Sequence, residues 1–388
     1  MKLRQLHSDF KVEELSDLKI INTKGNYKVF SVEKSGIETF YLLGYLAKQN
    51  RIPISEISVA GLKDKHALTK QFLAIPSRYD LKPLKEQNLK VTFLGFSDAN
   101  LKLGDLRGNR FEITVRDIKN GEIDGIYEKA KTIPLFGVPN YFDSQRFGSA
   151  LGGDFIIKHV LKKEYEKAVK IFLTSYSKSE NRRSKDEKRQ LLANWPNLSR
   201  VSVQNRVTRI IIEEYLRKKD WLAAYRKIPQ NLREMFVSAY QSWLWNECIK
   251  ELLRKTVNTK YLYSIDYSMG SLLFYKRLSH DEQTRLPKAF KTVSDELVPS
   301  EAEKRIIDKV LAKEGVRIDD FRIKDAVGNF FKSRERQVLL KPNNFHLSQP
   351  MIDELNDRGR ENRFKMIVKF ELPKASYATI IIKRLFNQ

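Results

Sequence analysis

The amino-acid sequence predicts an α+β protein, with a mixed β-sheet drawn from both ends of the chain and a mostly helical insertion between them. Two observations support this class. The first 150 residues alternate short strand-like runs with helical ones, and strand character returns at the C-terminus. The middle of the chain carries the clearest helical periodicity, and no internal repeat is visible.

Three segments of the first 150 residues have recognisable local patterns. Residues 36–47 read G-I-E-T-F-Y-L-L-G-Y-L-A, with apolar side chains at near-helical spacing, and Pro53 follows them. Residues 101–111 place two glycines and an asparagine in a basic turn. Residues 111–116 read F-E-I-T-V-R in strict alternation. We expect a helix, a turn and a half-buried strand in that order.

The composition changes near residue 160. Residues 162–189 contain ten Lys or Arg against five Asp or Glu, which fits either a solvated helix face followed by a mobile linker or a strip that contacts RNA. Residues 232–253 repeat large apolar side chains every three or four positions and predict a long helix. Residues 300–314 begin with a capping-box pattern and end before Gly315, which predicts a second amphipathic helix. At the C-terminus, residues 366–372 and 377–382 are expected to be strands on either side of a proline.

The composition limits the classes of function. The chain has 388 residues and a formal net charge of +24, so we expect two domains and a polyanionic partner such as RNA, or an anionic membrane surface. No apolar run is long enough to span a bilayer, and the N-terminus lacks the apolar core of a secretory signal. Cys248 is the single cysteine and the five histidines are scattered, which argues against disulfides and a metal site and fits the cytoplasm.

The segment A-G-L-K-D-K-H-A-L-T-K-Q at residues 60–71 carries the most distinctive chemistry. Asp64 lies between Lys63 and Lys65 and next to His66. A carboxylate among cations stays ionised and can act as a nucleophile or a base. The same segment is also compatible with an exposed charged turn without a function.

Three other clusters combine aromatic and polar residues. Residues 137–148 read G-V-P-N-Y-F-D-S-Q-R-F-G, which suits stacking on bases and hydrogen bonding but equally suits a core turn. Residues 236–246 hold aromatics at helical spacing, which favours core packing over ligand contact. Residues 372–379 read L-P-K-A-S-Y-A-T, a proline-marked turn before an expected edge strand.

Six blocks, taken together and in order, resemble the TruD-type tRNA pseudouridine synthases. Residues 160–230 carry little of the resemblance. The blocks are D-F-K-V-E-E (9–14), A-G-L-K-D-K-H-A-L-T-K-Q (60–71), L-K-L-G-D-L-R-G-N-R-F (101–111), V-P-N-Y-F-D-S-Q-R-F-G (138–148), S-A-Y-Q-S-W-L-W-N (238–246) and L-P-K-A-S-Y-A-T (372–379).

The resemblance implies a domain plan and a reaction. A catalytic domain with the pseudouridine-synthase fold is expected over residues 1–160 plus 326–388, and a family-specific insertion domain over residues 161–325. The reaction isomerises one tRNA uridine, usually at position 13, to pseudouridine without a metal or organic cofactor. The expected partner is tRNA alone, with no membrane and no obligate protein partner, and the enzyme is expected to be a cytoplasmic monomer.

The resemblance also assigns roles to individual residues. Asp64 matches the catalytic aspartate, and Arg4 aligns with its basic partner, a position where relatives often carry lysine. Lys63 and Lys65 are candidates for keeping Asp64 ionised or for contacting phosphate, and Glu14 is a candidate for polar support. Asp143 stands where many members have glycine. The residues expected to line the pocket for the extruded uridine are Phe10, Asn140, Phe142 and Tyr377, of which Phe142 is the expected stacking partner.

Other classes of function fit the chain less well. A non-catalytic RNA-binding protein would share the basic surface but has little need for Asp64, Asn140 and Phe142 together. A methyltransferase would need a glycine-rich turn after a strand, and none is found. Binding to a membrane surface would need an amphipathic anchor, which the sequence lacks.

Overall fold

The computed structural model describes residues 1–388 except 151–152, 178–179, 324–330, 358, 360–361 and 388. The chain divides into two compact units. Unit 1 comprises Met1–Val138 and Leu340–Gln388, and unit 2 comprises Pro139–Leu339. The chain passes between them through two short paired strands, β8 (Val138–Pro139) and β13 (Leu339–Leu340).

Unit 1 contains a ten-stranded mixed sheet whose main path runs in the order β14-β16-β7-β1-β4-β2-β6-β5. β1 pairs with β4 in parallel and with β7 in antiparallel orientation. The sheet therefore joins segments from both chain ends, as expected for an α+β protein. Its strands are β1 (Phe10–Leu15), β2 (Tyr27–Lys34), β3 (Ser58–Val59), β4 (Leu68–Pro76), β5 (Leu84–Glu86), β6 (Leu89–Ser97), β7 (Gly108–Lys119), β14 (Asn343–Leu347), β15 (Met351–Ile352) and β16 (Arg363–Pro373).

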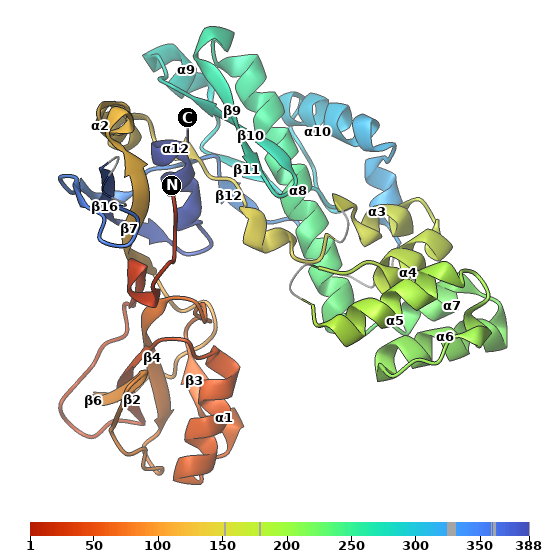
Figure 1. Cartoon of the computed structure of the whole chain (residues 1–388), viewed down its shortest axis with the longest axis horizontal. Helices are drawn as coiled ribbons and strands as arrows, with labels where there is room; N and C mark the ends of the chain where they lie inside the picture. Colours follow the sequence, from red (N-terminus) through yellow and green to blue (C-terminus); the bar gives the residue numbers. More distant parts are fainter. Residues whose placement is uncertain (151–152, 178–179, 324–330, 358, 360–361, 388) are drawn as a thin grey trace. The chain divides into compact units, whose positions relative to one another are not determined.

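α-Helices from the described part of unit 1 cover this sheet (Figure 1). α1 (Thr39–Asn50) packs beside β2 and β4, and its leucines join a buried cluster with Phe30 and Leu73. α2 (Ile123–Phe136) and α12 (Ala378–Phe386) contact each other on another part of the sheet. The helix predicted over residues 36–47 therefore forms three residues further along the chain.

Unit 2 is mostly helical and is organised around α8 (Gln230–Thr256). Tyr240 and Trp245 of α8 are fully buried, so the interpretation of the 236–246 aromatics as core is confirmed. Strands occur as the hairpin β9 (Leu262–Tyr267) and β10 (Gly270–Tyr275), and as the pair β11 (Ala289–Lys291) and β12 (Glu335–Gln337). Among the described residues of unit 2, the other α-helices are α3 (Ile156–Leu161), α4 (Tyr165–Thr174), α5 (Arg182–Ala193), α6 (Arg206–Lys218), α7 (Trp221–Arg226), α9 (His280–Arg285) and α10 (Glu301–Glu314).

The unit boundaries differ from the domain boundaries expected at residues 160 and 326. Residues 139–160 belong to unit 2 because their aromatic side chains pack on α8. The Phe142 ring lies 5.7 Å from that of Trp245, and the Phe155 ring lies 5.4 Å from that of Trp243.

Two local expectations are wrong. Residues 377–382 are not a strand, because Tyr377 is the N-cap of α12 and the run A-T-I-I-I continues as helix. A short apolar run buried on all sides has no periodicity that separates helix from strand. The linker expected within residues 162–189 is also wrong over residues 182–189, which form the first two turns of α5, capped by the Asn181 side chain.

Candidate active site

Asp64 lies in the loop between β3 and β4 of unit 1, and side chains from β2 and α1 hold the backbone of that loop. The Thr39 hydroxyl accepts a hydrogen bond from the Lys63 N–H (3.1 Å) and contacts the Lys63 carbonyl (3.2 Å). The Lys34 Nζ also donates to the Lys63 carbonyl, at 3.3 Å. These contacts fix the peptide that immediately precedes Asp64.

The Asp64 carboxylate has two polar contacts and remains accessible. Its Oδ2 lies 2.8 Å from Arg4 Nη1, and its Oδ1 accepts a hydrogen bond from the His66 N–H at 3.0 Å. The side chain is 34% exposed. The Arg4 guanidinium lies 4.2 Å from the centre of the Phe10 ring, so Arg4 bridges the acid and an aromatic ring. The structure thus brings Asp64, Arg4 and Phe10 together.

Lys63 and Glu14 form a second, buried pair. Lys63 Nζ lies 3.2 Å from Glu14 Oε1, and their side chains are 6% and 0% exposed. Glu14 Oε2 also accepts a hydrogen bond from the Phe72 N–H of β4 at 2.9 Å. The Lys63 ammonium therefore points into the protein, which favours a supporting role for both residues over a phosphate contact by Lys63.

A buried cation that the sequence analysis missed lies behind the loop. Lys34, at the end of β2, is 1% exposed and donates to the Ile37 carbonyl at 2.7 Å. Burial lowers the pKa of Lys34, and attraction to Asp64 and Glu38 partly offsets this shift. A lysine that ends a strand is common at a surface, so no local sequence signal marks Lys34 as buried near Asp64.

Phe10 and Tyr377 also belong to unit 1. Phe10 is buried and meets the Phe111 ring edge-on, with the ring centres 6.3 Å apart. Tyr377 is half-buried at the N-cap of α12, so it begins a helix rather than displaying its ring from an edge strand.

Asn140 and Phe142 belong to unit 2. The Asn140 Oδ1 accepts a hydrogen bond from Arg336 Nη2 (2.7 Å), and its Nδ2 donates to the Gln337 carbonyl (3.2 Å). The Phe142 N–H and carbonyl are both bound by the Asn246 side chain, at 2.9 and 2.8 Å. The Arg336 guanidinium lies 4.1 Å from the centre of the Phe142 ring.

Asp143, the departure from the family pattern, has a local structural role. It is 3% exposed, and its Oδ1 accepts a hydrogen bond from the Ser144 N–H at 2.7 Å. This contact caps the 3-10 helix Ser144–Phe147. The aspartate therefore stabilises the turn that follows Phe142.

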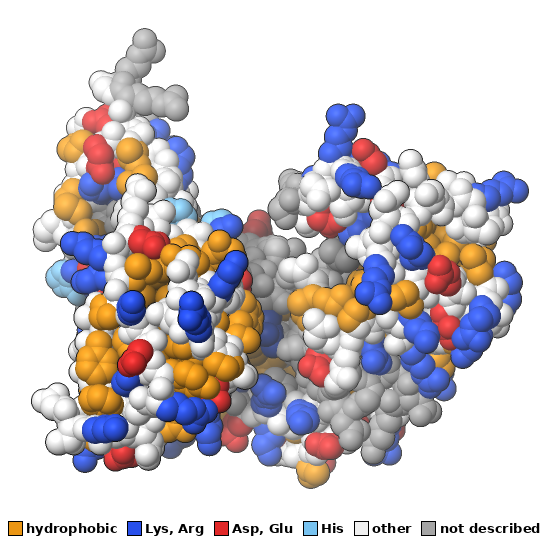
Figure 2. Space-filling view, turned by 90° about the horizontal axis from the view of Figure 1, so that it is seen from below, with side chains coloured by type: hydrophobic (Ala, Val, Ile, Leu, Met, Phe, Trp, Pro, Cys, Tyr) orange, Lys and Arg blue, Asp and Glu red, His pale blue; other side chains and the backbone are white. Residues whose placement is uncertain are grey.

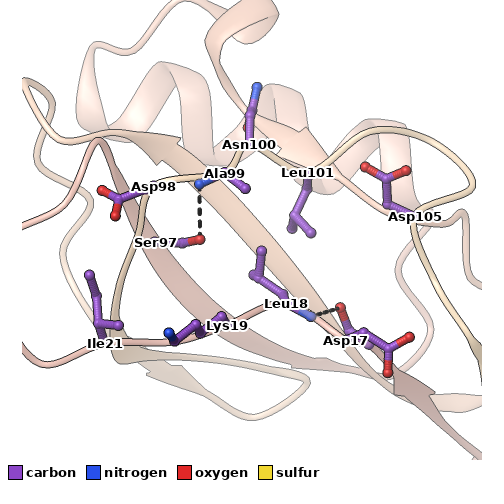
Figure 3. Close-up of a pocket in the computed structure, with 11 residues that line it drawn as sticks. Asp17, Leu18, Lys19, Ile21, Ser97, Asp98, Ala99, Asn100, Leu101 and Asp105 are labelled. Carbon is purple, nitrogen blue, oxygen red and sulfur yellow. Dashed lines mark hydrogen bonds between the residues drawn. The ribbon is translucent and has the colours of Figure 1, made fainter.

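A pocket of about 510 Å³ lies elsewhere in unit 1 and contains none of the predicted site residues. Three of its lining residues are aspartates, which repel phosphate, so it is unsuited to RNA (Figure 3). Its lining residues are Ser16, Asp17, Leu18, Lys19, Ile21, Ser97, Asp98, Ala99, Asn100, Leu101 and Asp105.

The described part of the chain contains no group of three or more His, Cys, Asp or Glu side chains arranged to hold a metal ion. Among those residues, no helix is long and apolar enough to cross a membrane. Lys and Arg side chains are spread over the visible face of both units and outnumber Asp and Glu there (Figure 2).

Comparison with known proteins decides the family. The family described as tRNA pseudouridine synthase D (TruD) matches residues 1–385. The chain belongs to this family. A "Probable tRNA pseudouridine synthase D 2" from Methanocaldococcus jannaschii is 41% identical over 100% of this chain and 92% of its own length. A "Probable tRNA pseudouridine synthase D 1" from Methanococcus maripaludis is 38% identical over the full length of both proteins.

A solved structure supports the same conclusion. The crystal structure of a putative tRNA pseudouridine synthase D from Methanosarcina mazei has a TM-score of 0.76 and 25% identity, and the match covers 100% of this chain and 93% of that one. The expected fold class is therefore confirmed. As a member of the family, the protein is an isomerase that acts on tRNA uridine.

Proposed function

We propose that this enzyme isomerises the uridine at position 13 of tRNA to pseudouridine and that Asp64 is its catalytic residue. The observation that carries the proposal is the environment of Asp64. Its carboxylate is fixed by Arg4 at 2.8 Å and by the His66 N–H at 3.0 Å, yet a third of the side chain stays open to solvent. An acid held in one orientation at an accessible surface suits nucleophilic or general-base chemistry.

The reaction sets the requirements for this acid. The bond between N1 of uracil and C1′ of the ribose breaks, and C5 then forms a bond to C1′. C5 loses its proton and N1 gains one, so the product is an isomer of the substrate. A carboxylate is competent for three routes: addition to C1′, addition to C6 of the base, or removal of the C2′ proton. In each route Arg4 can hold one carboxylate oxygen while the other reacts.

We further propose that the target uridine is extruded from the folded tRNA, because the reacting atoms are inaccessible in a stacked base. Phe142 is the proposed stacking partner, and its backbone is held on both sides by Asn246. Asn140 is proposed to hydrogen-bond the base, since the contact with Gln337 uses one of its two amide N–H groups. Phe10 and Tyr377 are proposed as further aromatic contacts of the extruded uridine.

The net charge of +24 supports tRNA binding through phosphates. We therefore expect the affinity to fall steeply with salt concentration. We also propose that the enzyme is cytoplasmic and monomeric.

The test is pseudouridine formation on unmodified tRNA by the purified protein without added cofactor. We expect a single modified site at position 13, and we expect Asp64→Asn to lower turnover by more than about a thousandfold. Asp98→Asn removes an exposed carboxylate elsewhere in unit 1 and is the matched control, with turnover unchanged. Full turnover by Asp64→Asn would remove Asp64 from the mechanism.

The rival function is RNA binding without chemistry. It predicts salt-sensitive tRNA binding by the wild type, no pseudouridine at any position, and unaltered or stronger binding by Asp64→Asn.

A further inference from the structure

The segment that carries Arg4 needs support, because it is irregular and partly strained. Residues 3–6 lie outside any strand or helix, and Arg4 itself has φ of 58°. A non-glycine residue in the left-handed region costs on the order of 1 kcal/mol and persists only where its surroundings impose it. Contacts made by its neighbours therefore hold the backbone at Arg4 in this conformation.

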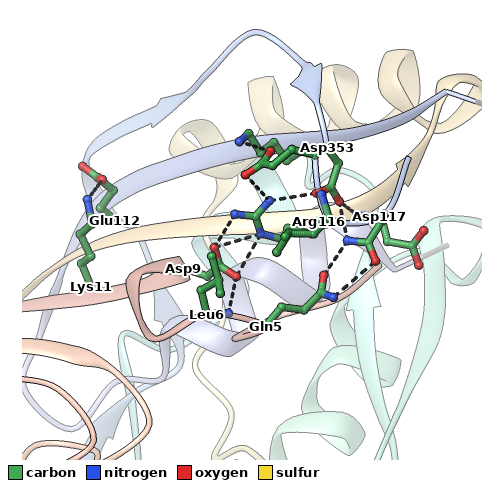
Figure 4. Close-up of polar contacts among 12 residues, drawn as sticks. Gln5, Leu6, Asp9, Lys11, Glu112, Arg116, Asp117 and Asp353 are labelled. Carbon is green, nitrogen blue, oxygen red and sulfur yellow. Dashed lines mark hydrogen bonds and ion pairs between the residues drawn. The ribbon is translucent and has the colours of Figure 1, made fainter. Parts of the chain in front are cut away.

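Arg116 of β7 binds both ends of this segment, and Figure 4 shows its contact with Asp9. Its backbone N–H and carbonyl exchange hydrogen bonds with those of Lys2, at 3.0 and 2.8 Å. Its guanidinium binds the Asp9 carboxylate, with Nη2 2.9 Å from Oδ1 and Nε 3.1 Å from Oδ2. A single residue thus fixes the chain two residues before Arg4 and five residues after it.

Asn356 binds the same segment at Lys2 and at Gln5. Its Oδ1 accepts a hydrogen bond from Lys2 Nζ at 2.6 Å, and its Nδ2 donates to Gln5 Oε1 at 2.6 Å. Gln5 is the residue next to Arg4 in the chain, so this contact ties the segment down immediately after Arg4.

Asp353 joins Arg116 to Asn356. Its Oδ1 lies 2.9 Å from Arg116 Nη1, and its Oδ2 accepts a hydrogen bond from Asn356 Nδ2 at 2.7 Å. The side chains of Asp9, Arg116 and Asp353 are at most 5% exposed. Buried charges this well paired resist displacement, because moving one leaves the others without a partner.

The partners of Arg116 stabilise its charge. Burial alone would lower the pKa of Arg116, but hydrogen bonds to Asp9 and Asp353 outweigh it and raise that pKa.

We propose that Arg116, Asp353 and Asn356 form a positioning network that holds residues 2–9 so that Arg4 lies opposite Asp64. None of the three contacts Asp64, so we expect them to act on the reaction mainly through Arg4. The proposal rests on the proposed function, in which Arg4 orients the catalytic acid.

A double-mutant cycle between Asn356 and Arg4 tests the network. In pseudouridine formation on tRNA, we expect Asn356→Ala to lower kcat about tenfold with KM within about twofold, since a displaced catalytic group costs rate rather than binding. In the Arg4→Ala background, the same change is expected to lower kcat by less than about twofold, because its target is gone. Gln5→Ala, at an exposed position, is also expected to lower kcat.

The control is Arg384→Ala. Arg384 also lies in unit 1 and is as buried as Arg116, with 3% of its surface exposed compared with 4% for Arg116. It donates a hydrogen bond to Thr132 of α2 rather than to the segment that carries Arg4. We expect this change to lower the melting temperature without changing kcat in the folded enzyme.

The positioning network would be overturned if Asn356→Ala kept the wild-type kcat. It would also be overturned if the losses in kcat of the two single variants multiplied in the double variant. Hydrogen exchange of the amides of residues 2–9 gives a second measurement that needs no activity. Faster exchange in Asn356→Ala is expected, and unchanged exchange would overturn the network. A wild type without any pseudouridine formation would instead overturn the proposed function, and the exchange experiment would still decide the network.

Discussion

The buried pair of Lys63 and Glu14 offers the sharpest test of how the active-site loop is built. In Lys63→Met, the side-chain volume is largely kept but the ammonium 3.2 Å from Glu14 Oε1 is lost. The Glu14 carboxylate then stays in a site with 0% exposure and keeps the Phe72 N–H as a donor. We expect a loss of stability in unit 1.

The magnitude follows from the distance and the burial. At an effective dielectric constant of about 20, two unit charges at this separation attract by about 5 kcal/mol. Removing one partner of a buried pair costs about 3–5 kcal/mol in measured cases. With a urea dependence of about 2–3 kcal/mol per M, the unfolding midpoint of unit 1 should fall by about 1–2.5 M. Adding Glu14→Gln to Lys63→Met should recover most of this loss, since a neutral amide can still accept from Phe72.

The distribution of tryptophan makes the assay specific for one unit. All four tryptophans (Trp195, Trp221, Trp243 and Trp245) lie in unit 2. Urea unfolding followed by tryptophan fluorescence therefore reports unit 2, whereas far-UV circular dichroism reports both units. We expect Lys63→Met to move the unfolding of unit 1, seen in the dichroism signal, to a lower urea concentration. The midpoint detected by fluorescence, which reports unit 2, should stay unchanged.

A phosphate-binding Lys63 predicts a different result. In that case Lys63→Met would weaken tRNA binding and reduce its salt dependence by about one charge, while the unfolding midpoint stayed unchanged. Lys65→Met is the matched control, because it removes the same charge from the exposed side of Asp64. A stability loss below about 1 kcal/mol for Lys63→Met would refute the reasoning from burial.

Two further predictions concern stability elsewhere. Glu251 of α8 is 6% exposed, and although burial opposes ionisation, hydrogen bonds from Lys309 and Lys313 lower its pKa to about 2. Because the pKa in the folded state is the lower one, this stabilisation is complete above the ordinary value of 4.5 and is lost as the pH falls toward 2. Glu251→Gln should therefore lower the urea midpoint detected by tryptophan fluorescence at pH 7. The difference in midpoint between this variant and the wild type should shrink below pH 4.5. A difference that stays constant with pH would contradict the prediction. In Gly108→Ala, the new Cβ would lie 2.1 Å from the backbone oxygen of Leu372, so β7 and β16 must separate. We expect a loss of at least about 2 kcal/mol by circular dichroism, whereas Gly121→Ala, with open space around it, should leave the midpoint unchanged.

Local rules predicted some elements closely. The helix expected over residues 300–314 forms as α10, with Ser300 and Glu303 making a capping box and Gly315 in the left-handed conformation at the C-cap. These signals work because caps and glycine act on the residues beside them. The pairing of Asp64 with Arg4 was predicted only from the family resemblance, since no local rule links residues sixty positions apart.

The positions of Arg116 and Lys34 could not be predicted in the same way. Strict alternation over residues 111–116 would put Arg116 on the same face as Glu112, toward solvent. The β7–β16 register shifts between Phe364 and Met366, and Asp117 has φ of 59°, so the strand turns Arg116 inward. Its partners Asp9 and Asp353 lie 107 and 237 residues away, and only the folded sheet brings them together.

The place of β16 in the sheet of unit 1 has a consequence for synthesis on the ribosome. β16 pairs with β7 along nearly its whole length, yet 243 residues separate the end of β7 from the start of β16. At about 5–20 residues per second, a nascent chain carries β7 with one edge unpaired for roughly 10–50 seconds. An open strand edge is a template for association with other chains. Newly made protein is therefore most prone to aggregate in this interval, before the last part of the sheet has been translated.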